Sequence, residues 1–342
     1  MLRRLKHKIL FLFRLDHHPV IRVYNGYGSS GKIIAFGHVL KLSPMLRKTY
    51  RHNWVVNLFS MLRLFMVKPY KCAKLSMEWD GTLLHAQAQD DGFFKFEWSP
   101  AVPPKPGWHN ISVNLEEEKY VAQKIHGTGE VNIPFHSTYA FVSDIDDTFL
   151  ISHSSRLRKR LYVLFTKNAR SRKPFAGVVN HYQLLAASAQ KENISNPFFF
   201  VSSSEWNLFD FIKEFSRENG LPKGVYLLSE LKRLKEVWKT GQNKHATKFF
   251  RIVRIIEAYP HLRFVLFGDD SQEDPNIYSS LVKHFPDKIY SVYIRRVHKT
   301  KYVTVQEAID KIIGAGTHCC YFIHSSEAID HSKSIGLIDL HA

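Results

Sequence analysis

Two carboxylates stand two residues apart at the end of an apolar run, where both could act on one small substrate. The run Phe141-Val-Ser-Asp-Ile-Asp-Asp-Thr-Phe-Leu150 is predicted to begin as a buried strand that delivers Asp144 and Asp146 at its carboxyl end. Side chains alternate along a strand, so residues two apart point the same way. One carboxylate could then attack phosphorus while the other handles the proton of the leaving group. The spacing indicates phosphoryl transfer; the alternative is a solvated acidic turn.

Hydroxyl groups follow two of the predicted strands. Thr148 comes directly after the first one, where we expect it to hydrogen-bond locally and stiffen the turn. The second apolar run, 198–204, ends in serines and places Ser202 at the strand tip, within reach of a phosphate oxygen. The alternative is structural, because Ser203 and Ser204 could cap a helix that begins near residue 205.

A lysine and a group of acids complete the set. Lys248 lies in a predicted amphipathic helix from His245 to Tyr259, although most lysines are merely solvated. The fourth element is a predicted strand from residue 263, ending in a glycine that permits close backbone approach, and it is followed by three acids, Asp269, Asp270 and Asp274. Hard oxygen ligands at a strand tip suit Mg²⁺, which binds one or two carboxylates together with water and substrate phosphate.

These residues resemble the four ordered motifs of a known superfamily. In chain order they are Asp144-x-Asp146-x-Thr148, Ser202, Lys248, and Gly268-Asp269 with Asp270 and Asp274. The pattern resembles the haloacid dehalogenase superfamily of phosphohydrolases from about Ser137 to the C-terminus. Segments 201–210 and 268–278 resemble its phosphatidate phosphatase branch, related to the fungal actin-patch enzyme and including bacterial-type members. The chain departs from that branch at Glu205, where Pro is usual, and at 270–271, where Ser-Gly is usual.

The resemblance implies a role for each residue. Asp144 would be the nucleophile that forms an aspartyl-phosphate, and Asp146 would protonate the leaving oxygen and then activate water. Lys248 would neutralise the nucleophile and the transferred group. Ser202 would bind the phosphoryl oxygens, and Ser203 and Thr148 are further candidates for substrate binding. Mg²⁺ would be held by Asp144, the backbone carbonyl of Asp146 and Asp269, with Asp270 and Asp274 competing for the outer metal position.

Basic residues are concentrated in two parts of the chain. Residues 156–173 hold eight lysines and arginines and no acid, beginning with Arg156 and Arg158. In the superfamily this segment forms a flap over the active site, so we expect it to steer an anionic substrate; the alternative is a solvated helix face. Residues 1–75 hold 15 lysines and arginines against the single acid Asp16, within a formal net charge of +17.

This asymmetry predicts an anionic partner. Apolar and aromatic residues lie among the basic ones in segments 1–15 and 46–69, which favours a membrane surface over nucleic acid. Residues 54–67 could equally be a core helix. No apolar run reaches the roughly 20 residues of a membrane-spanning helix, and no signal peptide is predicted. The three cysteines have no metal-ligand spacing, and together these features predict a cytoplasmic protein that binds peripherally to membranes.

The elements that must position the site predict an α/β fold. The alternation of strand and helix patterns after residue 139 indicates a doubly wound, mostly parallel sheet, and the resemblance implies that it is of the haloacid dehalogenase type. Five shorter strands, predicted at 20–24, 33–40, 73–79, 93–98 and 108–114 and separated by Gly, Pro and Asp turns, indicate a smaller antiparallel sandwich before it. We therefore predict a basic amphipathic segment, 1–18, a β-rich accessory domain with one helix, 19–138, and a phosphatase domain, 139–342.

The predicted function is a Mg²⁺-dependent phosphatidate phosphatase that hydrolyses a phosphomonoester through an aspartyl-phosphate. Its predicted partners are an anionic phospholipid substrate and a membrane surface. One alternative is a phosphatase for nucleic-acid ends or soluble phosphomonoesters, which the charge favours but for which no base-stacking module is visible. Another is an anionic-lipid adaptor without catalysis, against which the intact set of Asp144, Asp146, Lys248 and Asp269 argues.

Overall fold

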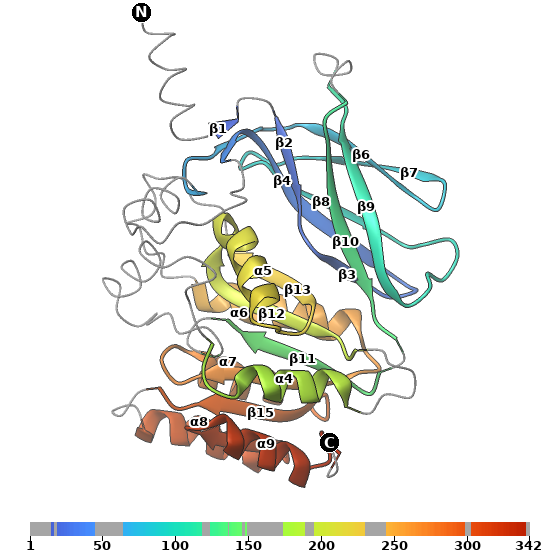
Figure 1. Cartoon of the computed structure of the whole chain (residues 1–342). Coiled ribbons are helices and arrows are strands. Elements are labelled where there is room, and N and C mark those ends of the chain that lie inside the picture. The colour runs from blue at the N-terminus through green and yellow to red at the C-terminus, as the bar shows by residue number, and fades with distance from the viewer. Residues whose placement is uncertain are drawn as a thin grey trace, which may run out of the picture. The chain divides into compact units, whose positions relative to one another are not determined.

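The protein is described here from a computed structural model of the 342-residue chain (Figure 1). The structure describes residues 15–16, 19–44, 64–117, 124–135, 137–145, 148, 174–188, 195–229, 244–297 and 302–339. The contacts within the chain divide it into two compact units. The described part of the first unit runs to Ile133 and also includes Trp206–Leu208, and the second unit holds the other described residues.

The first unit is built on a largely antiparallel sheet. Its strands are β1 (Leu15–Asp16), β2 (Val20–Val23), β3 (Gly26–Gly28), β4 (Ile33–Pro44), β5 (Lys68–Pro69), β6 (Lys74–Trp79), β7 (Thr82–Gln87), β8 (Phe93–Trp98), β9 (Gly107–Leu115) and β10 (His126–Ile133). The main path is β1-β4-β3-β10-β9-β6-β7, and β2, β5 and β8 also pair with β4. One pair, β3 with β10, is parallel.

The core of the first unit follows from residue alternation along its strands. In β8, Phe94 and Phe96 are buried while Lys95 and Glu97 are exposed. The buried phenylalanines join one apolar cluster with residues of the facing strands, such as Ile33, Met77 and Val113. The 3₁₀ helix η2 (Trp206–Leu208) belongs to this unit, and its Trp206 ring stacks on Tyr24 with 4.0 Å between centroids.

The five strands that the sequence predicted in this part of the chain are all present, within a few residues at their ends. The sequence did not predict β3, β7 or β10, which complete the sheet. The proposed sandwich arrangement stays a prediction. The segments at 1–14 and 46–63, including most of the possible helix 54–67, lie outside the described residues.

The second unit is an α/β structure around a six-stranded parallel sheet. Its strands are β11 (Tyr139–Asp144), β12 (Phe198–Glu205), β13 (Gly224–Ser229), β14 (Arg263–Asp269), β15 (Ile289–Arg295) and β16 (His318–Phe322), in the order β13-β12-β11-β14-β15-β16. All neighbouring pairs run parallel. Runs such as Phe198–Val201 are buried without interruption, as expected for a parallel sheet covered on both faces.

Helices connect these strands and cover the sheet. They are α4 (Val178–Ala187), α5 (Phe209–Glu218), α6 (Lys244–Ala258), α7 (Asp274–His284), α8 (Tyr302–Gly314) and α9 (Ser325–Ser334). Helix α4 contacts α9, whereas α7 contacts both α6 and α8. Figure 1 shows α4 and α5 on the near side of the sheet. The predicted helix 245–259 is α6, and helical structure begins near residue 205 as predicted, with η2 at Trp206 followed by α5 at Phe209.

Two further predictions from the sequence concern the state of the cysteines and the presence of membrane-spanning helices. Cys72 is exposed, Cys319 and Cys320 are half-buried, and all three are free thiols. Among the described residues, no helix combines the length and the apolar composition that crossing a membrane requires.

Candidate active site

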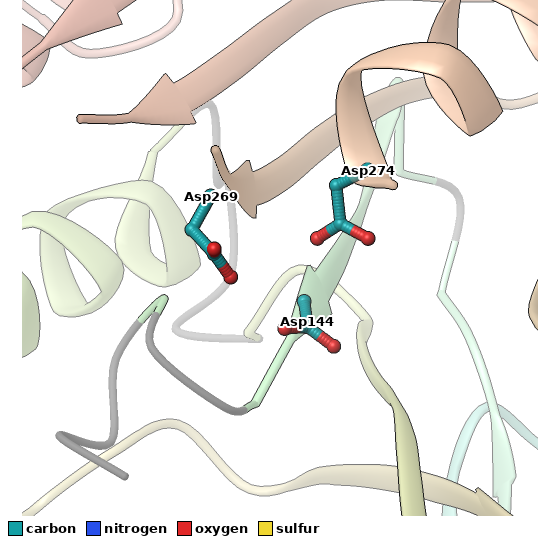
Figure 2. Close-up of side chains that lie close together, drawn as sticks. All are labelled: Asp144, Asp269 and Asp274. Atoms are coloured by element: carbon teal, nitrogen blue, oxygen red, sulfur yellow. The ribbon is translucent and has the colours of Figure 1, made fainter. Parts of the chain in front are cut away.

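Two adjacent strands of the parallel sheet deliver the first two acids of the site. β11 ends at Asp144 and β14 ends at Asp269, and the strands are paired in register, with Ser143 opposite Phe267. Their carboxyl ends therefore meet at the same edge of the sheet, where open α/β sheets bind ligands. Asp274 joins them from the first residue of α7. We call these three residues the carboxylate cluster; Figure 2 shows their side chains close together.

The carboxylate cluster is compact and closed to solvent. One oxygen from each of its three side chains lies within 4.8 Å of the others, and all three residues are buried. Asp274 reaches this place because Gly268 has no side chain. A Cβ at position 268 would stand 2.5 Å from Asp274 Oδ2 and 2.7 Å from the ring of Tyr278. The sequence predicted that another part of the chain approaches the backbone closely at Gly268, and this part is the start of α7, which lies against the end of β14.

Lys248 supplies the cation of the site from the buried face of α6. Its Nζ lies 2.8 Å from Asp144 Oδ1 and also donates a hydrogen bond to Asp274 Oδ1. Burial by itself would lower the pKa of this amine, but the charges of Asp144 and Asp274 outweigh burial and raise the pKa. Lys248 is therefore a permanent cation that holds two of the three acids.

The charges of the carboxylate cluster are not balanced by this lysine. Burial, and then the charge of Asp274, raise the pKa of Asp269 to about 8, although hydrogen bonds from Ser271 and the charge of Lys248 act in the opposite direction. Asp274 Oδ2 is buried and has no hydrogen-bond partner among the described residues. Buried carboxylates need a counter-charge. A divalent cation that prefers oxygen ligands fits this donor set.

Asp270 lies outside the carboxylate cluster. Its Oδ1 accepts a hydrogen bond from the backbone N–H of Val297 at 2.7 Å, and its Oδ2 accepts one from the hydroxyl of Tyr321 at 2.8 Å. Both partners stand on the neighbouring part of the sheet, after β15 and within β16. Of the two acids between which the sequence could not choose, the structure brings Asp274 to the other acids and directs Asp270 away from them.

The hydroxyl groups of the site take different positions. Ser202 is buried at the end of the apolar run of β12, and its Oγ accepts a hydrogen bond from the N–H of Ser204 at 2.8 Å. Ser203 is also buried in that strand. Among the described residues, Thr148 Oγ1 has a distant partner rather than a local one: it donates to Asp269 Oδ2 at 3.4 Å, across 121 positions of the chain.

Three predicted site residues lie outside the described residues, namely Asp146, Arg156 and Arg158. The basic run 156–173 lies there as well. The roles that the sequence assigned to these residues stay predictions.

Sequence reasoning missed a set of supporting contacts. Ser143 donates to the carbonyl oxygen of Asp144 and lies 2.7 Å from the hydroxyl of Tyr182, so two residues support the chain at the first acid. Arg251 donates to the carbonyl of Ser202 at 3.2 Å. Arg295 donates to the carbonyl of Thr148 at 3.0 Å. Of these residues, only Arg295 could have been singled out from the sequence, because an arginine at the end of an apolar strand is unusual.

Comparisons with known proteins match the part of the chain that carries this site. Residues 139–296 match the family described as phosphatidate phosphatase APP1, catalytic domain. The chain is 26% identical over 191 residues to the phosphatidate phosphatase APP1 of Saccharomyces cerevisiae, an alignment that covers 56% of this chain and 31% of the yeast protein. An uncharacterized protein of Schizosaccharomyces pombe is 24% identical over 173 residues, with 49% of this chain and 27% of that protein covered.

The chain thus spans less than a third of the length of these two relatives. Among solved structures, a carbohydrate acetylesterase from Xanthomonas citri aligns with 93% of this chain and 75% of its own, at 10% identity and a TM-score of 0.34, which is too low to indicate a common fold. The family match, in contrast, includes β11, α6, β14 and α7, the elements that carry the carboxylate cluster and Lys248. Residues 139–296 are thus similar to phosphatidate phosphatase APP1 catalytic domains.

Proposed function

We propose that this chain is a Mg²⁺-dependent phosphatidate phosphatase, a phosphoric monoester hydrolase that works through an aspartyl-phosphate on a doubly wound, haloacid dehalogenase-like domain. One observation carries the proposal. Asp144 is buried at a strand end, paired with Lys248, and stands beside Asp269 and Asp274. The similarity of residues 139–296 to phosphatidate phosphatase APP1 catalytic domains supports the choice of a lipid phosphate as the substrate.

Asp144 is the nucleophile in this proposal. Its ion pair with Lys248 favours the carboxylate over the acid, so an oxygen lone pair is available for attack. A bond forms between an Asp144 oxygen and phosphorus while the bond from phosphorus to the ester oxygen breaks. Ser143 and Tyr182 support the backbone at Asp144, which limits movement of the attacking group.

Asp146 is the acid and then the base. It gives a proton to the departing alcohol oxygen in the first step and takes a proton from the attacking water in the second. Water then forms the new bond to phosphorus as the bond to Asp144 breaks, which releases inorganic phosphate and restores both carboxyl groups. The position of Asp146 two residues after Asp144 supports this division of labour.

The cation and the hydroxyls bind the phosphoryl oxygens. Lys248 neutralises part of the charge that spreads over these oxygens in the transition state. The Ser202 hydroxyl, which accepts a hydrogen bond from the N–H of Ser204, is the first candidate to donate to phosphate. Ser203 and Thr148 are further candidates for this contact. Arg156 and Arg158 would attract the anionic headgroup.

Asp144, Asp269 and Asp274 would hold the metal ion, together with the backbone carbonyl of Asp146. When bound, Mg²⁺ supplies positive charge that offsets the acids and polarises a phosphoryl oxygen. The three acids are suited to this work because Lys248 compensates only part of their charge.

The basic residues of the N-terminal part support a membrane surface as the place of action. Residues 1–75 carry 15 lysines and arginines and one acid, and each basic residue near an anionic bilayer contributes about 1 kcal/mol of attraction. We place the protein in the cytoplasm, bound peripherally to such a surface.

The test is phosphate release from phosphatidate in mixed detergent micelles with Mg²⁺. Wild type is compared with Asp144→Asn, which keeps the shape of the side chain and removes its charge. A matched control is Asp287→Asn, the same replacement at an exposed turn before β15, where the left-handed backbone (φ 62°) also suits Asn. We expect turnover by wild type and Asp287→Asn, and a loss of at least about 10³-fold in Asp144→Asn, since the nucleophile is gone.

Other substrates in the same assay separate the alternatives. Turnover of a soluble phosphomonoester or a 3′-phosphorylated oligonucleotide without phosphatidate turnover would keep the mechanism and exclude the lipid. If wild type releases phosphate from no substrate and still binds anionic liposomes, the proposal fails and the protein is an adaptor.

A further inference from the structure

Arg295 is a buried cation at the site edge of the parallel sheet that the proposed mechanism leaves without a role. It is the last residue of β15 and only 3% exposed. Its guanidinium lies between two aromatic rings, 4.6 Å from the centroid of Phe175 and 4.7 Å from that of Phe322. Such a position removes water from both faces of the charge and fixes its plane.

The hydrogen bonds of Arg295 all go to uncharged acceptors. Its Nε donates to the carbonyl of Thr148 at 3.0 Å, its Nη2 to the hydroxyl of Ser325 at 3.0 Å, and its Nη1 to the carbonyl of Ile323 at 3.3 Å. It forms no ion pair with a carboxylate of the described residues. A buried charge without such a partner is costly to keep, and an apolar residue of similar volume would often serve stability as well. The reason to keep this buried charge is therefore sought in the groups to which the guanidinium donates.

Thr148 connects this guanidinium to the carboxylate cluster. On one side its carbonyl accepts from Arg295, and on the other its hydroxyl donates to Asp269 Oδ2. Thr148 is itself buried. In the chain it stands four positions after Asp144 and two after Asp146. A contact that holds Thr148 in place therefore also holds the Asp269 carboxylate.

We propose that Arg295 is a positioning residue that, through the carbonyl of Thr148, holds Thr148 against Asp269. The inference rests on the proposed function for its kinetic effect, although the contact itself does not. Arg295 touches no reacting atom; it acts by keeping Thr148, and through its hydroxyl the Asp269 carboxylate, in one position. A displacement of about 1 Å at such a group costs on the order of 10²-fold in rate.

The chemistry of arginine suits this task and that of lysine does not. Three donors on one rigid plane reach three acceptors that lie in different directions, and the flat group fits between two rings. A lysine keeps the charge but cannot make all three contacts. Arg295→Lys therefore separates the geometry from the charge, and Arg263→Lys is the matched control. Arg263 also lies over an aromatic ring, 4.4 Å from the centroid of Tyr290, but it is exposed at the amino end of β14.

The kinetic test uses the full chain and phosphatidate in mixed micelles. For Arg295→Lys we expect kcat to fall about 10²-fold with little change in KM, because the lost positioning matters in the transition state. Arg263→Lys should match wild type. Arg295→Ala should regain part of its kcat in guanidinium at tens of millimolar, whereas Arg263→Ala should not respond. Unchanged kcat in Arg295→Lys, or a loss that follows only the fraction of folded protein and resists rescue, would overturn the proposal.

A second measurement keeps the inference separate from the proposed function. Deuterium uptake is measured by mass spectrometry on the peptide that contains Thr148. Uptake should be faster in Arg295→Lys than in wild type and unchanged in Arg263→Lys, whether or not phosphatidate is the substrate. A wild type that hydrolyses nothing would defeat the proposed function, and equal uptake in all three proteins would defeat the role of Arg295.

A milder variant covers the case in which Arg295→Lys does not fold. Ser325→Ala removes one of the three acceptors and leaves the contact with Thr148 in place. We expect a smaller effect in the same direction, a decrease of about 3- to 10-fold in kcat with faster uptake at Thr148. No change in either quantity would count against the proposal.

Discussion

Asp270 and Asp274 lie four positions apart, yet their carboxylates have different surroundings. Asp274 has a buried oxygen without a hydrogen-bond partner among the described residues and is paired with Lys248. Asp270 accepts from Val297 and Tyr321. If the carboxylate cluster holds the metal ion, Asp274 is needed for binding and Asp270 is not.

Thermal unfolding with and without Mg²⁺ checks this assignment. At a Mg²⁺ concentration 100 times Kd, binding should stabilise wild type by about 2.7 kcal/mol, and a chelator should remove the effect. Asp274→Asn should lose most of the shift, because an amide is a weaker ligand without charge. Asp270→Asn should keep it, even if its own unfolding temperature is lower. If the shift disappears in Asp270→Asn and persists in Asp274→Asn, the metal is bound by Asp270 and the assignment to Asp274 is wrong.

The site shows which parts a sequence can and cannot predict. Asp144, Lys248 and Asp269 could be found from motif order, because each follows or lies within a strongly apolar element. The choice of Asp274 could not, since it depends on where α7 begins and on how closely it approaches β14. The role of Thr148 was also out of reach, because its partners are 121 and 147 positions away.

The secondary-structure elements also divide into those that the sequence can predict and those that it cannot. Strands β11, β12 and β14 of the parallel sheet contain uninterrupted apolar runs, so their existence follows from composition. β3 and β10 contain glycines, and most side chains of β7 are exposed. Their strand character comes from pairing with neighbours, which a local pattern does not contain.

The contact between β14 and α7 gives a prediction at this scale. Gly268→Ala would place a methyl group 2.5 Å from Asp274 Oδ2, so α7 or β14 must shift. We expect a loss of stability of about 1–3 kcal/mol, as for other overpacked sites, and a decrease of about 10²-fold in kcat, measured by urea unfolding and phosphate release. Gly314→Ala is the control, because nothing lies within 4 Å of its added Cβ. Equal behaviour of the two variants would show that the approach of α7 is not required.

At the scale of the whole molecule, each unit buries a neutral histidine. Burial lowers the pKa of His38 from 6.5 to about 4, against the opposing charge of Asp91. Burial, with the charges of Arg295 and His331, lowers the pKa of His181 to about 3. Each folded-state pKa lies below the unfolded value, so the unfolded chain binds more protons between these values. This contribution to stability is complete above about pH 6.5 and is lost as the pH falls.

His181→Gln tests this dependence in the second unit. The amide can still reach Ser332, which lies 2.8 Å from His181 Nε2, but it does not titrate. Between pH 7.5 and pH 5, wild type should lose about 2 kcal/mol of unfolding free energy through this histidine. His181→Gln should lose that much less, as measured by urea unfolding of the second unit at both pH values. The control is His85→Gln, because His85 is exposed. If His181→Gln and His85→Gln lose the same unfolding free energy between the two pH values, the expectation is wrong.

The three free thiols differ in surroundings, and this difference makes the protein a ready substrate for site-selective labelling. Burial raises the pKa of Cys319 and of Cys320 to about 12, so both stay protonated at neutral pH and react slowly with electrophiles. Cys72 is exposed in the first unit. A maleimide dye or spin label added briefly to the native protein will therefore attach at Cys72 and report on the first unit, without any cysteine having to be engineered in or out.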